Sequence, residues 1–196
     1  MSRYKKNLSF TEGFTLIEFI VIVSIFAIIA SIVLINFSGF TNTIGHSNTV
    51  HDIALVIRQA QVTGQSGVGN SDLQDVEPEG RGVLFETGSD EIVRFIDTNG
   101  NGEYDSNDVI TETLTVNDTV NNGAVITELC IMDGSYDCGQ GELAIIFERP
   151  KLEPIIWSTN HRMPAGQSSA LITVTSADEQ LEKTIEISST GHITVQ

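Results

Sequence analysis

The run from Phe14 to Phe37, FTLIEFIVIVSIFAIIASIVLINF, constrains this chain most, because its 24 residues carry a single charge, that of Glu18. As a helix, a segment of that length would extend about 36 Å, which exceeds the roughly 30 Å hydrocarbon core of a bilayer. Three basic residues precede the run, and this flank is expected to stay cytoplasmic: Arg3, Lys5 and Lys6. The pattern therefore predicts a single-pass membrane protein, with the polar remainder of the protein outside the cytoplasm.

Glu18 sets this segment apart from an ordinary signal or anchor. A secretory signal has a shorter apolar region, of about 7–15 residues, which ends in a small-residue cleavage site. In a simple anchor, a carboxylate near the bilayer centre costs about 2.5–3.5 kcal/mol, somewhat less near an interface, so Glu18 needs a partner. Cleavage between Gly13 and Phe14 would create one, since the new α-amino group of Phe14 would lie one helical turn away.

The segment Gly13-Phe-Thr-Leu-Ile-Glu18, after a basic leader and before a long apolar helix, resembles the class III signal of type IV pilins and type II secretion pseudopilins. The resemblance implies that a prepilin peptidase cleaves after Gly13 and N-methylates the new first residue, Phe14, to N-methylphenylalanine. It also implies that Glu18 neutralises the N-terminal amine of a neighbouring subunit and sets the register of helices in a filament. The alternative is an ordinary membrane anchor with a chance glutamate.

A second helical segment follows the apolar run. The interval 36–45 is rich in weak helix formers, and each of its glycines costs about 1 kcal/mol relative to alanine, so a bend or frayed stretch is expected there. Apolar residues then recur at helical spacing over 51–62, which predicts an amphipathic helix packed on a sheet. Within it, residues 53–61 resemble the second half of the helix in GspH/FimT-like minor pseudopilins.

From residue 66 onward the periodicity becomes that of strands. Short β-branched runs bounded by turn residues lie at 83–85, 91–96, 109–116, 124–130, 143–147, 155–157, 170–175, 183–187 and 187–195. The predicted fold is α+β, with a long N-terminal transmembrane helix packed on an antiparallel β-sheet head, as in pilins. The predicted parts are a leader (1–13), a transmembrane or filament-core helix (14–37), an amphipathic second half (38–65) and a β-rich head (66–196).

One loop between predicted strands has the spacing of a calcium site. Oxygen-bearing side chains occupy positions 1, 3, 5, 9 and 12 of the loop, at Asp97, Asn99, Asn101, Asp105 and Asp108. Gly102 falls at position 6, where an EF-hand loop turns sharply, and Glu103 would supply a backbone carbonyl at position 7. Asp108 stands where EF-hands have glutamate, as in dockerin-type loops. The pattern predicts a structural Ca²⁺ site, and the alternative is a plain Asn/Gly-rich turn.

Cys130 and Cys138, the only two cysteines, bracket a short segment. In an exported head they are expected to form a disulfide, with free thiols in a reducing compartment as the alternative. The residues between them would then be a stapled surface loop and a candidate contact point.

The net charge and the motifs of the sequence disfavour two classes of function, nucleic-acid binding and catalysis. A formal net charge of −16 disfavours contact with nucleic acid, and no nucleophile elbow, phosphate-binding glycine loop or HExxH motif indicates an enzyme. The resemblance to pilins implies a structural subunit, a minor pilin or pseudopilin, that is located in the inner membrane before assembly. Its partners would be the prepilin peptidase, the inner membrane and other subunits of a type IV pilus-like or type II secretion filament. The alternatives are an adhesion or ligand-binding module displayed on such a filament and, less favoured, a DNA-uptake minor pilin.

Overall fold

The structure is a computed structural model that describes residues 13–66, 80–116, 123–159, 161–163, 168–176 and 179–196. Of the predicted leader, only Gly13 lies within the described residues. The protein divides into two compact units, Met1–Thr41 and Asn42–Gln196.

One helix, α1 (Leu16–Ser66), contains both of the helical segments that the sequence predicts. The interval 36–45 is helical throughout, Gly39 and Gly45 included, so the expected frayed stretch is not a break in the helix. The cost of these glycines is offset by the long helical segments on both sides, because extending an existing helix is far easier than starting one.

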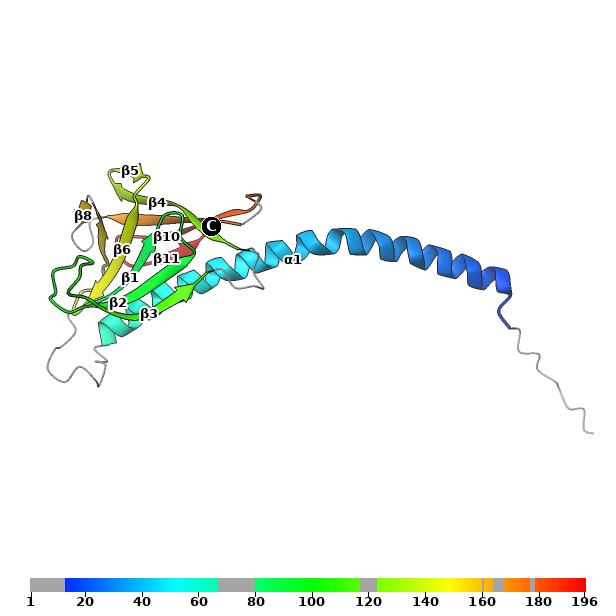
Figure 1. Ribbon diagram of the computed structural model, residues 1–196, viewed down its shortest axis with the longest axis horizontal. Helices are drawn as coiled ribbons and strands as arrows, with labels where there is room; N and C mark the ends of the chain where they lie inside the picture. The colour runs from blue at the N-terminus through cyan, green and yellow to red at the C-terminus, as the bar shows by residue number, and fades with distance from the viewer. Residues whose placement is uncertain (1–12, 67–79, 117–122, 160, 164–167, 177–178) are drawn as a thin grey trace, which may run out of the picture. The chain divides into compact units, whose positions relative to one another are not determined.

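Within the described residues, eleven strands form two antiparallel sheets, which are drawn in Figure 1. The first sheet has the order β3 (Val109–Thr115), β2 (Glu91–Asp97), β1 (Gly80–Glu86), β6 (Glu142–Glu148), β7 (Ile155–Ser158) and β8 (His161–Met163). The second has the order β11 (Ile193–Val195), β10 (Glu182–Ile187), β9 (Ser169–Thr175), β4 (Val125–Asp133) and β5 (Ser135–Cys138).

The α+β class and the antiparallel pairing agree with the prediction, and nine of these strands overlap the segments proposed from sequence. The sequence did not indicate two of them, β5 and β8, because each is a short return strand without an apolar alternation. The sequence also did not indicate that the strands divide into two sheets.

The main core lies between the last part of α1 and both sheets. Val50, Ile53, Ile57 and Ala60 form the buried stripe of the helix, at the spacing expected of one helix face. At Gly64 the helix comes so near to β6 that a Cβ would lie 2.4 Å from the backbone oxygen of Phe147. Both sheets contribute aliphatic side chains to this core, which explains why the second half of the helix is amphipathic.

A smaller apolar cluster covers the opposite face of the first sheet. It contains Leu84, Phe95, Ala144, Ile146 and Ile155, with Val93, Tyr104 and Trp157 packed against it. Strands β1 and β6 are therefore buried on both faces and read as nearly continuous apolar runs in the sequence.

Candidate functional site

The predicted cleavage site lies at the exposed start of α1. Gly13 and Phe14 precede the first helical residue, Leu16, and the Phe14 side chain is 82 % exposed. A bond in this position is outside the helical hydrogen-bond ladder, so a peptidase can reach it without unwinding the helix.

Glu18 forms a capping box with Thr15. The Thr15 backbone N–H donates to Oε2 of Glu18 at 3.0 Å, and the Glu18 backbone N–H donates to Oγ1 of Thr15 at 3.3 Å. The Thr15 hydroxyl also donates to Oε2 of Glu18, at 2.8 Å. This reciprocal pair satisfies two of the free backbone N–H groups at the helix start. That Glu18 pairs with the amine of a neighbouring subunit stays a prediction. The structure adds a second role for Glu18, as part of the helix cap.

Beyond the cap, α1 has a segment that could cross a membrane. Leu16–Leu34 has a mean hydropathy of 2.9 over 19 residues, and none of this window is buried within the protein. The large apolar side chains described here are about half exposed or more, from Val23 at 47 % to Phe14 at 82 %. Apolar surface of this extent requires a covering, which a bilayer or other apolar helices can supply.

The predicted calcium loop connects β2 to β3 and packs on the outer face of the first sheet. Tyr104, in the middle of the loop, meets the ring of Phe95 edge to face with the ring centres 4.8 Å apart. Phe95 in turn occupies the space over Gly82 of β1, where an added Cβ would lie 2.2 Å from the ring. An aromatic residue of the sheet thus positions the loop.

Asp97, at loop position 1, organises the turn. It is 1 % exposed, and its two carboxylate oxygens accept hydrogen bonds from the backbone N–H groups of Gly100 and Gly102, each at 2.8 Å. Both glycines have a left-handed backbone conformation, with φ of 66° and 68°, which a residue with a Cβ adopts only at a cost. Gly102 therefore has the turning role that the sequence predicts for position 6.

Asn99 and Asn101 direct their side-chain oxygens to backbone groups two residues ahead, and their amide nitrogens toward Asp105. Asn99 Oδ1 accepts from the Asn101 backbone N–H at 3.0 Å, and Asn101 Oδ1 accepts from the Glu103 backbone N–H at 2.8 Å. Their Nδ2 groups both donate to Oδ2 of Asp105, at 3.2 Å and 2.9 Å. Three of the predicted ligand residues are thus brought into direct contact.

Asp108 closes the base of the loop. Its Oδ2 accepts from the Asp105 backbone N–H at 3.0 Å, and its Oδ1 accepts from the Thr98 backbone N–H at 3.4 Å. Burial raises the pKa of Asp108, and the negative charges of Asp97 and Asp105 raise it further. The pKa of Asp105 is lowered, chiefly by the hydrogen bond from the Asn107 backbone N–H.

These observations fit a cation site in part. The negative charges of Asp97 and Asp105 raise the pKa of the neighbouring Asp108, the turn has the predicted glycine, and oxygen is the donor that Ca²⁺ prefers. Several of the predicted ligand oxygens already accept backbone N–H groups, however. Outside this loop, the described residues contain a group of three possible metal-ligand residues: Glu128, Cys130 and Cys138. Their ligand atoms lie within 4.8 Å of one another.

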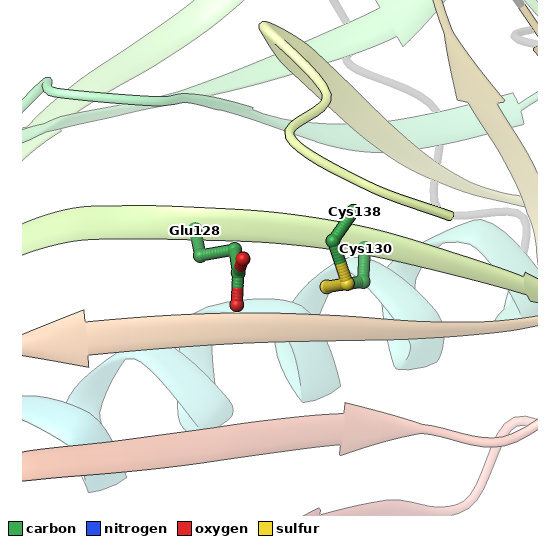
Figure 2. A group of neighbouring side chains, drawn as sticks. All are labelled: Glu128, Cys130 and Cys138. Carbon is green, nitrogen blue, oxygen red and sulfur yellow. A yellow bond between two sulfur atoms is a disulfide. The ribbon is translucent and has the colours of Figure 1, made fainter. Parts of the chain in front are cut away.

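That second group is a disulfide beside a carboxylate, as Figure 2 shows. Cys130 of β4 and Cys138 of β5 are directly opposite each other and are bonded, with Cα atoms 4.0 Å apart. Oxidised sulfur atoms are not thiolate ligands, so this group is not a metal site in this state. The predicted disulfide is present, and it ties together the hairpin of the two strands.

The stapled hairpin presents two large apolar residues to solvent. Met132 and Tyr136 are cross-strand neighbours, 37 % and 57 % exposed. This agrees with the prediction of a stapled surface segment between the cysteines.

Comparisons with known proteins give no family for this protein: no protein-family model, no curated protein and no solved structure matches it. The fold and the site define an α+β protein whose N-terminal helix is apolar enough to span a membrane and whose head carries two antiparallel sheets and a disulfide.

Proposed function

We propose that this protein is a structural subunit, a minor pilin or pseudopilin, of a type IV pilus-like or type II secretion filament. The observation that carries the proposal is the segment Gly13–Glu18: its predicted scissile bond is exposed immediately before a 51-residue helix, the first part of which, Leu16–Leu34, is apolar. In this proposal a prepilin peptidase cleaves after Gly13 and methylates Phe14. The subunit then waits in the inner membrane, with its head outside the cytoplasm.

The exposed apolar residues of Leu16–Leu34 supply the physical basis for assembly. Before assembly they are covered by lipid, and afterwards by the same segment of neighbouring subunits, so the apolar surface is kept from water in both states. Glu18 would pair with the amine of a neighbouring Phe14, because a carboxylate in an apolar bundle needs a compensating charge.

The disulfide supports a head outside the cytoplasm. Disulfides persist in oxidising compartments and are rare in the cytosol. The basic residues of the leader, Arg3, Lys5 and Lys6, favour the same orientation, since positive flanks stay on the cytoplasmic side.

The first test is the N-terminus of the protein isolated from its native host. Mass spectrometry should find a polypeptide that begins at Phe14 and has a methyl group on its amine. An unprocessed polypeptide that still begins with the leader would contradict the proposal.

The second test separates the two roles of Glu18. Glu18→Gln keeps a side chain that can complete the capping box but removes the charge, whereas Thr15→Ala removes the cap and keeps the carboxylate. We expect E18Q to insert and be cleaved yet be absent from filaments, and T15A to be incorporated. Immunoblots of sheared filaments and of membranes measure both. If E18Q assembles like the wild type, Glu18 acts only as a cap and the register role is wrong.

We also propose that the loop Asp97–Asp108 binds Ca²⁺ as a structural ion of the head. The raised pKa of Asp108, to which the charges of Asp97 and Asp105 contribute, supports it, because a divalent cation would relieve their repulsion. Calorimetric titration of the full-length protein in detergent should show Ca²⁺ binding that Asp108→Ala weakens. Absence of binding by the wild type at millimolar Ca²⁺ would contradict the site.

A displayed adhesion or ligand-binding module is the second candidate, and the exposed pair Met132 and Tyr136 favours it. Under this alternative, Met132→Ser with Tyr136→Ser should leave the subunit in filaments but remove the filament's attachment to its target surface. A DNA-uptake role is disfavoured by the net charge of −16, and a gel shift at low salt would test it.

A further inference from the structure

The loop between β2 and β3 contains two consecutive Asn-Gly pairs, Asn99-Gly100 and Asn101-Gly102. Asparagine is chemically labile when glycine follows it, because no Cβ hinders attack by the glycine nitrogen on the asparagine amide. In this reaction the glycine nitrogen loses its proton and bonds to Cγ of the asparagine, the bond between Cγ and Nδ2 breaks, and ammonia leaves. Water then opens the cyclic succinimide to aspartate or isoaspartate, so no oxidant, reductant or cofactor is needed.

The two glycine nitrogens that would attack, those of Gly100 and Gly102, both donate a hydrogen bond to the buried carboxylate of Asp97. The Gly100 N–H donates to Oδ1 of Asp97 and the Gly102 N–H to Oδ2, each at 2.8 Å. Asp97 is 1 % exposed, so water does not compete for these two bonds. Hydrogen bonds to a charged acceptor are stronger than those between neutral groups.

We propose that Asn99 and Asn101 are deamidation sites and that Asp97 protects both of them while the loop is folded. Attack requires each glycine N–H to lose its proton and its peptide plane to turn toward the preceding asparagine amide. The bonds to Asp97 oppose both changes. The asparagine side chains are also held in place, since their Oδ1 atoms accept hydrogen bonds from the backbone N–H groups of Asn101 and Glu103.

Deamidation would alter the loop at a defined place. The Nδ2 groups of Asn99 and Asn101 donate to Oδ2 of Asp105, at 3.2 Å and 2.9 Å. Conversion to a carboxylate replaces each donor with a negative charge, and an attraction becomes a repulsion. The first deamidation therefore loosens the loop and exposes the second site to the same reaction.

The experiment incubates the full-length protein in detergent at mildly alkaline pH and follows each site by peptide mapping with mass spectrometry. Asp97→Ala frees both glycine amides. Asp108→Ala is the matched control, because it removes one carboxylate from the same loop without touching Gly100 or Gly102. Loss of a hydrogen bond to a charged group corresponds to a change in rate of about tenfold or more. Deamidation at Asn99 and Asn101 should therefore accelerate by about that factor in D97A and by less in D108A.

The third Asn-Gly pair of the sequence, Asn122-Gly123, is an internal reference in every sample. In the wild type, urea should accelerate deamidation at Asn99 and Asn101 relative to the buffer rate, which tests the protection even if D97A does not fold. The proposal is overturned if the wild-type sites react equally fast in buffer and in urea. It is also overturned if folded D97A deamidates at the wild-type rate or more slowly.

Discussion

At the residue scale, Gly82 decides how the loop Asp97–Asp108 is placed. A Cβ at this position would lie 2.2 Å from the ring of Phe95, its cross-strand partner, so only glycine lets that ring lie over β1. The ring then packs against Tyr104 of the loop. Gly82 of β1 thus affects the position of the polar loop that follows β2, because the Phe95 ring that lies over it contacts Tyr104 of that loop.

Gly82→Ala is therefore expected to destabilise the head by about 1–3 kcal/mol, since the Phe95 ring must move within a packed cluster. Denaturant unfolding of the full-length protein in detergent, followed by near-UV circular dichroism, measures this loss. Gly141→Ala is the matched control: nothing lies within 4 Å of its added Cβ and its φ is not positive, so its effect should stay within about 0.5 kcal/mol. Equal stability of the two variants would contradict the packing argument.

At the scale of elements, the hairpin of β4 and β5 depends on its disulfide. All four residues of β5 are exposed, and this strand lies at the edge of its sheet, so little apolar burial holds it there. Cys130 is bonded to Cys138 across the pair, which limits the freedom of the unfolded hairpin. The opposite neighbour of β4, β9, is held instead by buried residues such as Ile172 and Val174.

Replacing both cysteines with serine should lower the free energy of unfolding by about 2–3 kcal/mol, as a short closed loop predicts. Amide hydrogen exchange should rise mainly in β5 and in the facing half of β4, while β9 and β10 stay protected. Adding a reductant to the wild type should reproduce the effect and leave the variant unchanged. Uniform loss of protection across both sheets would show that the disulfide supports the whole head.

At the scale of the whole molecule, the two units differ in what covers their apolar residues. In Asn42–Gln196 the helix stripe is buried against two sheets, whereas the described apolar residues of Met1–Thr41 are largely exposed. The unit Asn42–Gln196 therefore has a core of its own, and the unit Met1–Thr41 needs lipid or other helices.

A fragment that begins at Asn42 should consequently fold without detergent, keep the disulfide and remain monomeric. Its many acidic residues should keep copies apart at low salt. Circular dichroism, gel filtration and thiol titration measure these properties. A fragment that aggregates with the strand signal lost would show that the N-terminal unit is needed for the head to fold.

The candidate sites were predictable to different degrees. The spacing at Asp97–Asp108 indicated which residues carry oxygen ligands, but not that Asp97 bonds both Gly100 and Gly102. The capping box of Thr15 and Glu18 was readable as Thr-x-x-Glu before an apolar run, and the prediction concentrated on the charge instead. Which groups form hydrogen bonds within a turn depends on its backbone angles, and the spacing of residues in the sequence does not specify these angles.

The sequence by itself determined the elements: an apolar helix, an amphipathic continuation, most strands and the pairing of the only two cysteines. These follow from local periodicity and composition. Only the tertiary structure decided that the strands form two sheets and that a bulge in β4 near Thr127 changes which of its residues face the core, so that Ile126 and Leu129 are both buried. The physical reason is that a strand's neighbours are set by which apolar faces can be buried together, and this depends on segments far apart in the sequence.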